Sequence, residues 1–170
     1  MTDIQCTLCG EVFTGTPALS CDHPVHYFDV PESERSSRCS VGTDDCVIDE
    51  SLFFVRGCLE LPVLGGDDDF HFGVWISLSE KSFSEWVATF DKPNRSHIGP
   101  FFGWLATELA IYPSTVNLKT MVHLRDEGLR PQVVLDETSH PLAIEQRDGV
   151  SIQRLTEIYT RFTHSATDGG

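Results

Sequence analysis

The sequence predicts an α+β fold, in which an antiparallel sheet built from two hairpins carries two flanking helices and an irregular, cysteine-rich N-terminal lobe. Apolar residues alternate over 53–63, 70–78 and 115–124, as half-buried strands require, and recur at helical spacing after Ser82 and Ser151. Residues 1–50 show little periodicity, yet they hold five of the six cysteines. We expect a single domain over 1–170, with the lobe at 1–50, an α+β core at 51–164 and a frayed tail at 165–170.

The lobe contains the sharpest local motif, Cys6-Thr7-Leu8-Cys9-Gly10, which is half of a zinc knuckle. Two thiolates at this spacing can hold one Zn²⁺ when the backbone turns tightly, and a glycine after the pair permits that turn. No second Cys-x-x-Cys follows, so the remaining ligands are left open among Cys21, His23, His26, Cys39 and Cys46. The alternatives are thiols that bind no metal and a redox pair. A redox pair should open a helix, which residues 12–15 do not favour.

The first hairpin of the core combines residues 53–63 with residues 70–78, joined by an aspartate-rich turn. The apolar positions are odd in the first strand and even in the second, so the paired residue numbers must sum to an odd value if both sets face one core. The other face then carries Arg56, Glu60, His71 and Trp75, which could form a binding surface. Antiparallel sheets often leave one face solvated, and a second covering element is the other alternative.

The remaining elements follow in order along the chain. Ser82-Phe83-Ser84-Glu85 matches a capping box and starts a short helix that ends near Pro93. Residues 96–113 read as a loop leading into a short strand, and 115–124 with 131–135 form the second hairpin. Ser151 can cap a final helix with an apolar stripe made by Ile152, Leu155, Ile158, Tyr159 and Phe162. No strand–helix–strand rhythm predicts a parallel sheet.

The charge balance excludes several classes of partner. Twelve Lys and Arg against 26 Asp and Glu give a net charge of −14, which repels phosphate backbones and anionic membranes. The longest uncharged stretch, residues 96–107, is far shorter than the ~20 apolar residues of a membrane helix. The first residues show no secretory signal, so we expect a cytoplasmic protein without disulfides.

No familiar catalytic motif accompanies these elements. The seven histidines are scattered and form no His-Glu-x-x-His, and the chain lacks both a Gly-x-Ser-x-Gly elbow and a phosphate-binding glycine loop. The many carboxylates show no spacing that selects a general acid and its base. The sequence therefore assigns no catalytic residue.

A set of short motifs in fixed order gives the chain a family resemblance. The motifs are Cys6-x-x-Cys9-Gly10, Asp45-Cys46-Val47-Ile48-Asp49, the segments 53–63, 73–79 and 102–105, Asn117-Leu118-Lys119 and His140-Pro141-Leu142-Ala143. Over about Cys6 to Tyr159 the chain resembles the uncharacterised bacterial family called domain of unknown function 2199. The resemblance implies a bacterial, cytosolic, single-domain protein and brings no established activity. The family pattern keeps the Cys-x-x-Cys-Gly and the Cys46 region, which favours Cys6, Cys9 and Cys46 as the metal ligands.

These observations favour a small acidic binding or interaction module, with a structural zinc as its expected cofactor and an unknown protein or small molecule as its partner. The alternative is an enzyme of the metal-assisted hydrolase type that uses the strand face of Arg56, Glu60, His71 and Trp75.

Overall fold

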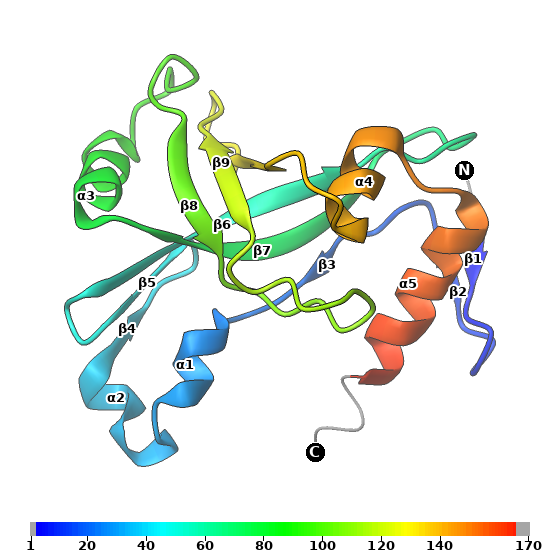
Figure 1. The fold of residues 1–170 in the computed structure, drawn as a ribbon, viewed down its shortest axis with the longest axis horizontal. Coiled ribbons are helices and arrows are strands. Elements are labelled where there is room, and N and C mark those ends of the chain that lie inside the picture. Colours follow the sequence, from blue (N-terminus) through cyan, green and yellow to red (C-terminus); the bar gives the residue numbers. More distant parts are fainter. Residues whose placement is uncertain (1–2, 166–170) are drawn as a thin grey trace.

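The fold is centred on a closed five-stranded β-barrel (Figure 1). The structure is a computed structural model, and it describes residues 3–165. The barrel strands are β6 (Leu52–Leu61), β7 (Phe70–Leu78), β8 (Phe101–Leu105), β9 (Lys119–His123) and β10 (Gln132–Leu135). Shorter strands surround it: β1 (Asp3–Gln5), β2 (Val12–Thr14), β3 (Leu19–Ser20), β4 (Cys39–Val41) and β5 (Asp45–Ile48). The helices are α1 (Val25–Asp29), the 3-10 turn η1 (Glu32–Glu34), α2 (Arg35–Arg38), α3 (Glu80–Thr89), α4 (Pro141–Asp148) and α5 (Ile152–Ser165).

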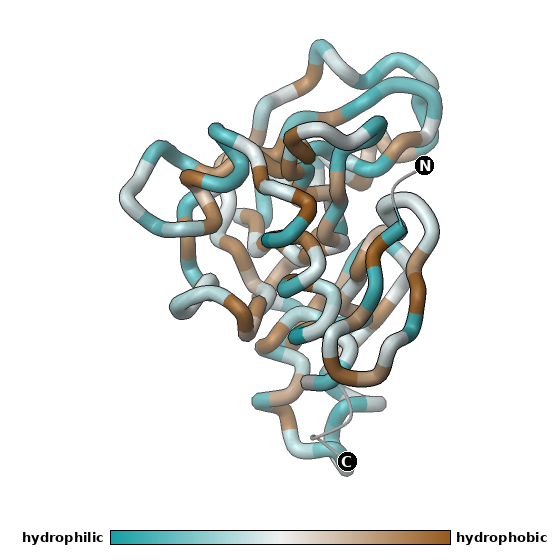
Figure 2. Tube along the Cα trace, turned by 90° about the vertical axis from the view of Figure 1, so that its right-hand side faces the viewer, coloured by the Kyte–Doolittle hydropathy of each residue, from teal (hydrophilic) through white to brown (hydrophobic). Residues whose placement is uncertain are grey.

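The predicted hairpin of β6 and β7 is confirmed. The two strands pair antiparallel from Phe53 with Leu78 to Leu61 with Phe70, so paired numbers sum to 131, an odd value, throughout (53 + 78 = 131). The odd apolar set of β6 and the even set of β7 therefore face one core, and its fully or nearly buried members are Val55, Leu59, Leu61, Phe70, Phe72, Val74, Ile76 and Leu78. In Figure 2 many of the brown, apolar segments lie in the middle of the molecule.

The predicted fold class is wrong, because the sheet closes on itself instead of staying an antiparallel sheet of two hairpins with flanking helices. The segment expected as a loop into a short strand forms β8, which joins β7 to β9. Strand β10 then pairs parallel with β6, with Gln132 opposite Cys58. Gly57 allows this approach, since a Cβ there would lie 2.6 Å from Cγ2 of Val133. Closure joins residues more than seventy positions apart, which no local pattern encodes.

The N-terminal lobe packs on the outside of the barrel. Strand β5 pairs antiparallel with β6, β4 pairs with β5, and β3 pairs parallel with β7. Between the lobe and the barrel lies a second apolar cluster, formed by Val30, Cys46, Ile48, Phe54, Trp75 and Ala106. The outer face of the β6–β7 hairpin is therefore covered at its Trp75 end.

Capping side chains set where the longer helices begin. Helix α3 starts one turn earlier than the predicted capping box, because Oγ of Ser79 accepts the N–H of Ser82 at 3.2 Å. Helix α4 was not predicted; Nδ1 of His140 accepts the N–H of Leu142 at 3.1 Å and caps it. The predicted cap of α5 is confirmed, since Oγ of Ser151 accepts the N–H of Arg154 at 3.1 Å. Three residues of the predicted stripe have no exposed surface, namely Leu155, Ile158 and Tyr159.

The first hairpin of the chain, β1–β2, lies against α5 at one side of the barrel (Figure 1). Ile4 on β1 is buried, and the ring of Phe13 on β2 stacks on Tyr159 with 5.1 Å between centroids. The Tyr159 hydroxyl also donates a hydrogen bond to the carbonyl of Pro17. These contacts bring the two ends of the described chain together.

Two further expectations concern the chain as a whole. The single domain with its division at residue 50 stays a prediction, and the expected tail lies beyond the described residues from 166 on. Within residues 3–165, no helix has both the length and the apolar character needed to cross a membrane.

Candidate metal centre and the surface around it

The Cys-x-x-Cys motif forms the tight turn between β1 and β2. The N–H of Cys6 donates to the carbonyl of Glu11 at 2.8 Å, and the N–H of Gly10 donates to the carbonyl of Cys6 at 3.0 Å. Gly10 has a φ of 77°, a left-handed conformation that glycine adopts without steric cost. The turn therefore brings the side chains of Cys6 and Cys9 to the same end of the hairpin.

His164, in the last turn of α5, completes a group of three potential ligands. Its Nε2 lies 3.2 Å from Sγ of Cys6, and the ligand atoms of Cys6, Cys9 and His164 all lie within 4.8 Å of one another. A hydrogen bond from the N–H of Thr7 to Oγ1 of Thr160, at 3.3 Å, holds the turn against the helix. No other such group of three is found in the part of the chain that the structure describes.

The surroundings of Cys6 favour its thiolate. The backbone N–H of Cys9 lowers its pKa most, burial opposes this, and the N–H of Leu8 and the side chains of His164 and Cys9 lower it further, to about 6. N–H groups directed at a sulfur stabilise the negative charge that a metal ligand carries. Cys6 is buried, whereas Cys9 is exposed and His164 is half-buried. One side of the group therefore faces solvent.

Two thiolates and an imidazole match the ligand preferences of Zn²⁺, which binds sulfur and nitrogen donors with tetrahedral geometry. Three protein ligands would leave one tetrahedral position for water or for a donor from another molecule. The donor set thus fits two kinds of zinc site. One is a structural site whose fourth ligand comes from another molecule, and the other keeps an exchangeable water as its fourth ligand.

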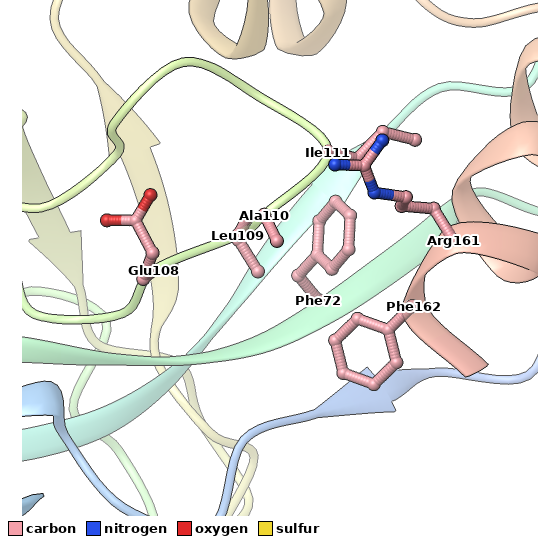
Figure 3. A pocket seen from close by; sticks show the side chains of 7 residues that line it. All are labelled: Phe72, Glu108, Leu109, Ala110, Ile111, Arg161 and Phe162. Atoms are coloured by element: carbon pink, nitrogen blue, oxygen red, sulfur yellow. The ribbon is translucent and has the colours of Figure 1, made fainter. Parts of the chain in front are cut away.

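Two cavities border this group along α5. A polar depression of ≈ 720 Å³ is lined by His164 itself, by Thr160 and by Arg161 among others. It shares Ile111 and Arg161 with an apolar pocket of ≈ 210 Å³, whose wall includes Phe72. Figure 3 shows the Arg161 guanidinium reaching above the Phe72 ring. The surface beside the metal group therefore offers apolar contact next to a positive charge.

Cys46 does not join Cys6 and Cys9. It lies on β5 with no exposed surface, in the apolar cluster beneath the lobe. Burial, with smaller contributions from Cys39 and Asp45, raises the pKa of Cys46 to about 12, so its thiol stays protonated. A protonated thiol in an apolar cluster is a poor metal ligand.

The four candidates for the open ligand position lie elsewhere in the lobe. Cys21 and Cys39 pack against the same apolar cluster as Cys46. His23 stacks on Tyr27 at 4.1 Å between centroids, and His26 lies against Phe54 at 5.0 Å. None of these four belongs to the three-ligand group.

The candidate binding face on β6–β7 divides into two cross-strand pairs, and the first is Arg56 opposite Trp75. Trp75 has no exposed surface, and its Nε1 donates to the carbonyl of Cys21 at 2.9 Å. The Arg56 guanidinium lies 5.6 Å from the Trp75 ring and 3.9 Å from the Asp22 carboxylate. At this end the face is an interface between barrel and lobe.

The second pair, Glu60 opposite His71, lies nearer the solvent. Glu60 Oε1 accepts a hydrogen bond from Nη1 of Arg125 at 2.7 Å and lies 3.9 Å from Nδ1 of His71. Nε2 of Gln132 on β10 also donates to Glu60, at 3.4 Å. This cluster joins β6 to the β9–β10 connection. The Glu60 carboxylate is therefore already engaged by hydrogen bonds within the barrel.

His164 is not among the metal ligands that the sequence predicts. The sequence places His164 near the end of the predicted final helix, outside its apolar stripe. Because His164 is more than 150 residues from Cys6, no local spacing connects the two. Thr160 and His164 stand one helical turn apart, beside the buried residue Tyr159. That spacing places His164 next to whatever packs on the stripe, which only the tertiary structure identifies as the β1–β2 hairpin.

Fold and site together define a small β-barrel protein with a candidate metal group between its N-terminal hairpin and its C-terminal helix. Residues 5–150 match the family described as "Uncharacterized protein conserved in bacteria (DUF2199)", and the chain belongs to this family. The resemblance drawn from the motifs is thereby confirmed. Neither the curated proteins nor the solved structures contain a match to the chain. The matched region includes Cys6 and Cys9 but ends before His164.

Proposed function

We propose that the protein is a zinc-binding module, in which Cys6, Cys9 and His164 hold one Zn²⁺ that fastens the N-terminal hairpin to the end of α5. The observation that carries the proposal is the meeting of three ligand atoms within 4.8 Å from opposite ends of the chain. The turn that presents the two cysteines is already formed and hydrogen-bonded. Metal binding would therefore need little backbone rearrangement.

The role we assign to the metal is structural. The β1–β2 hairpin has only two short strands, and isolated two-stranded hairpins are marginally stable in water. Its contacts with α5 are few, chiefly Ile4, the Phe13–Tyr159 stack and the Thr7–Thr160 hydrogen bond. A metal that joins hairpin and helix adds its binding free energy to the stability of this contact.

The class of function that we propose is an interaction module in the cytoplasm. The net charge of −14 would accelerate encounter with a basic partner and keep nucleic acids away. The strand-face hydrolase alternative is not favoured, since Trp75 is buried and Glu60 is engaged by Arg125. A stoichiometric partner recovered from a native lysate at low salt, and lost at high salt, would support the interaction role. Recovery of no partner from metal-loaded protein would count against it.

The zinc proposal is tested by metal analysis of protein purified without chelator. We expect one Zn²⁺ per chain, and a loss of affinity in Cys9→Ser and His164→Ala that exceeds the ~10–100-fold cost of losing an outer-shell partner. Cys39→Ser is the matched control, because it makes the same change in a half-buried cysteine outside the group. Stoichiometric zinc that survives in His164→Ala would contradict the proposed ligand set.

A further inference from the structure

A second site lies where α3 covers one end of the barrel, away from the three-ligand group. The loop between α3 and β8 carries Arg95, which is only 2% exposed. Its guanidinium donates through Nη2 to the carbonyl of Leu129 at 3.2 Å and lies 5.8 Å from the Phe90 ring. Within residues 3–165, no carboxylate lies within 4 Å of the guanidinium as an ion-pair partner. Arg95 is thus a buried cation with no direct ion-pair partner among the described residues.

Three hydrogen-bond donors at this place have no acceptor among the described protein groups. They are Nε and Nη1 of Arg95 and Nε1 of Trp86, whose side chain is 4% exposed. Both residues line the same small cavity of ≈ 30 Å³. Guanidinium and indole nitrogens can only donate, so an occupant has to be an acceptor, and the buried positive charge favours an anionic one. The cavity exceeds the ~10–15 Å³ that one water needs, which suits a group of about two atoms of that size.

The outer side of this cavity carries carboxylates instead of hydrogen-bond donors. Asp44, Trp86 and Phe90 also line an adjoining open depression of ≈ 450 Å³, which contains Asp45 and Asp91 as well. Asp44 is paired with Arg130 at 2.8 Å, whereas Asp45 and Asp91 have no ion-pair partner among the described residues. Burial and the neighbouring Asp44 carboxylate raise the pKa of Asp45, so a cationic group placed beside it would stabilise its charged form. A lone anion approaching from this side would be repelled, whereas a cationic group would be attracted.

We propose that the two adjoining cavities form one binding site for a small amino-carboxylate. Its carboxylate would accept hydrogen bonds from Arg95 and Trp86, and its ammonium group would lie among the aspartates of the outer depression. The exposed ring of Phe90 adds cation–π attraction for the ammonium group. The carboxylate supplies the counter-charge that Arg95 lacks, and the amine makes entry past the aspartates favourable. The site is independent of the proposed zinc centre.

The test is calorimetric titration and thermal unfolding of the full, metal-loaded chain with a series that varies the spacing between amine and carboxylate. The probes are glycine, β-alanine, γ-aminobutyrate and 6-aminohexanoate, with acetate, methylammonium and chloride as single-charge controls. We expect at least one zwitterion to bind saturably and about tenfold or more tighter than any control, and to raise Tm by about 5 °C at a concentration 100 times its Kd. Acetate or chloride binding as tightly as every zwitterion would show that the site takes an adventitious anion only and would overturn the proposal.

Two variants examine the two halves of the site, and thermal unfolding of each without ligand shows whether it is still folded. Trp86→Phe keeps one aromatic ring but removes the N–H donor together with the second ring of the indole, so the Kd should rise about tenfold or more. Trp104→Phe, at an exposed position on β8, is its control. Asp91→Asn should weaken zwitterion binding without strengthening methylammonium binding, whereas Glu50→Gln, at an exposed turn, should change nothing. Unchanged zwitterion affinity in both Trp86→Phe and Asp91→Asn, or no saturable binding by any zwitterion, would refute the assignment.

Discussion

Removal of the metal should loosen the β1–β2 hairpin while the barrel stays folded. The proposed zinc ligands Cys6, Cys9 and His164 lie at the junction between this hairpin and α5. The other direct links are the few side-chain contacts of Ile4, Phe13 and Thr7. If zinc is present at about 100 times its Kd, its withdrawal lowers the stability of the linked state by about 2.7 kcal/mol. Local opening of the hairpin should then become about 100-fold more frequent.

Hydrogen exchange measured by mass spectrometry tests this expectation. Peptides covering residues 3–14 should lose about 100-fold of their protection after chelation and in Cys9→Ser, because opening no longer costs a metal bond. Peptides from β6 and β7 should keep their protection, since those strands belong to the barrel hydrogen-bond network. Equal protection of residues 3–14 with and without zinc, in samples whose metal content has been measured, would refute the proposed link.

Three other changes probe the fold and its electrostatics. Gly57→Ala should destabilise the protein by about 1–3 kcal/mol in urea unfolding, because the new Cβ would meet Val133 at 2.6 Å. Tyr159→Phe should lower stability by about 1 kcal/mol in the same assay, because the hydroxyl donates to the Pro17 carbonyl. Backbone and side-chain hydrogen bonds lower the pKa of Asp126, so its contribution is complete above its unfolded pKa of about 3.9 and is lost as pH falls towards the lower folded pKa. Asp126→Asn should therefore be less stable than the parent at pH 7, and the deficit should shrink in unfolding curves recorded down to pH 2.

Each of these changes has an outcome that would contradict its reasoning. A neutral Gly57→Ala would mean that β10 can move away from β6 without cost, and Ser51→Ala at an exposed position next to β6 is its control. A stability loss in Tyr159→Phe no larger than the error of the assay would show that the hydroxyl is equally well hydrated in the unfolded chain. A stability deficit of Asp126→Asn that stays constant with pH would exclude a charge-dependent role for this carboxylate.

The local patterns of the sequence determined the parts of the structure that depend on near neighbours. Alternation of apolar residues was enough to predict that β6 and β7 pair, and its parity was enough to predict that their paired residue numbers sum to an odd value. Ser151 with its apolar stripe was enough to predict α5. The Cys-x-x-Cys-Gly spacing likewise predicted a tight turn with both thiols at one end, and the short motifs identified the family. In each case the physical cause acts over a few residues, as side-chain periodicity, a capping hydrogen bond or a glycine conformation.

Only the tertiary structure decided how these parts meet. Closure of the barrel depends on β10 approaching β6 at Gly57, and the third potential metal ligand, His164, comes from the opposite end of the chain. The same packing buries Trp75 beneath the lobe and leaves the buried Arg95 with no direct ion-pair partner among residues 3–165, in a cavity beneath α3. Contacts between residues far apart in the chain depend on which surfaces fit and which charges they bring together, and no spacing within the sequence encodes that fit.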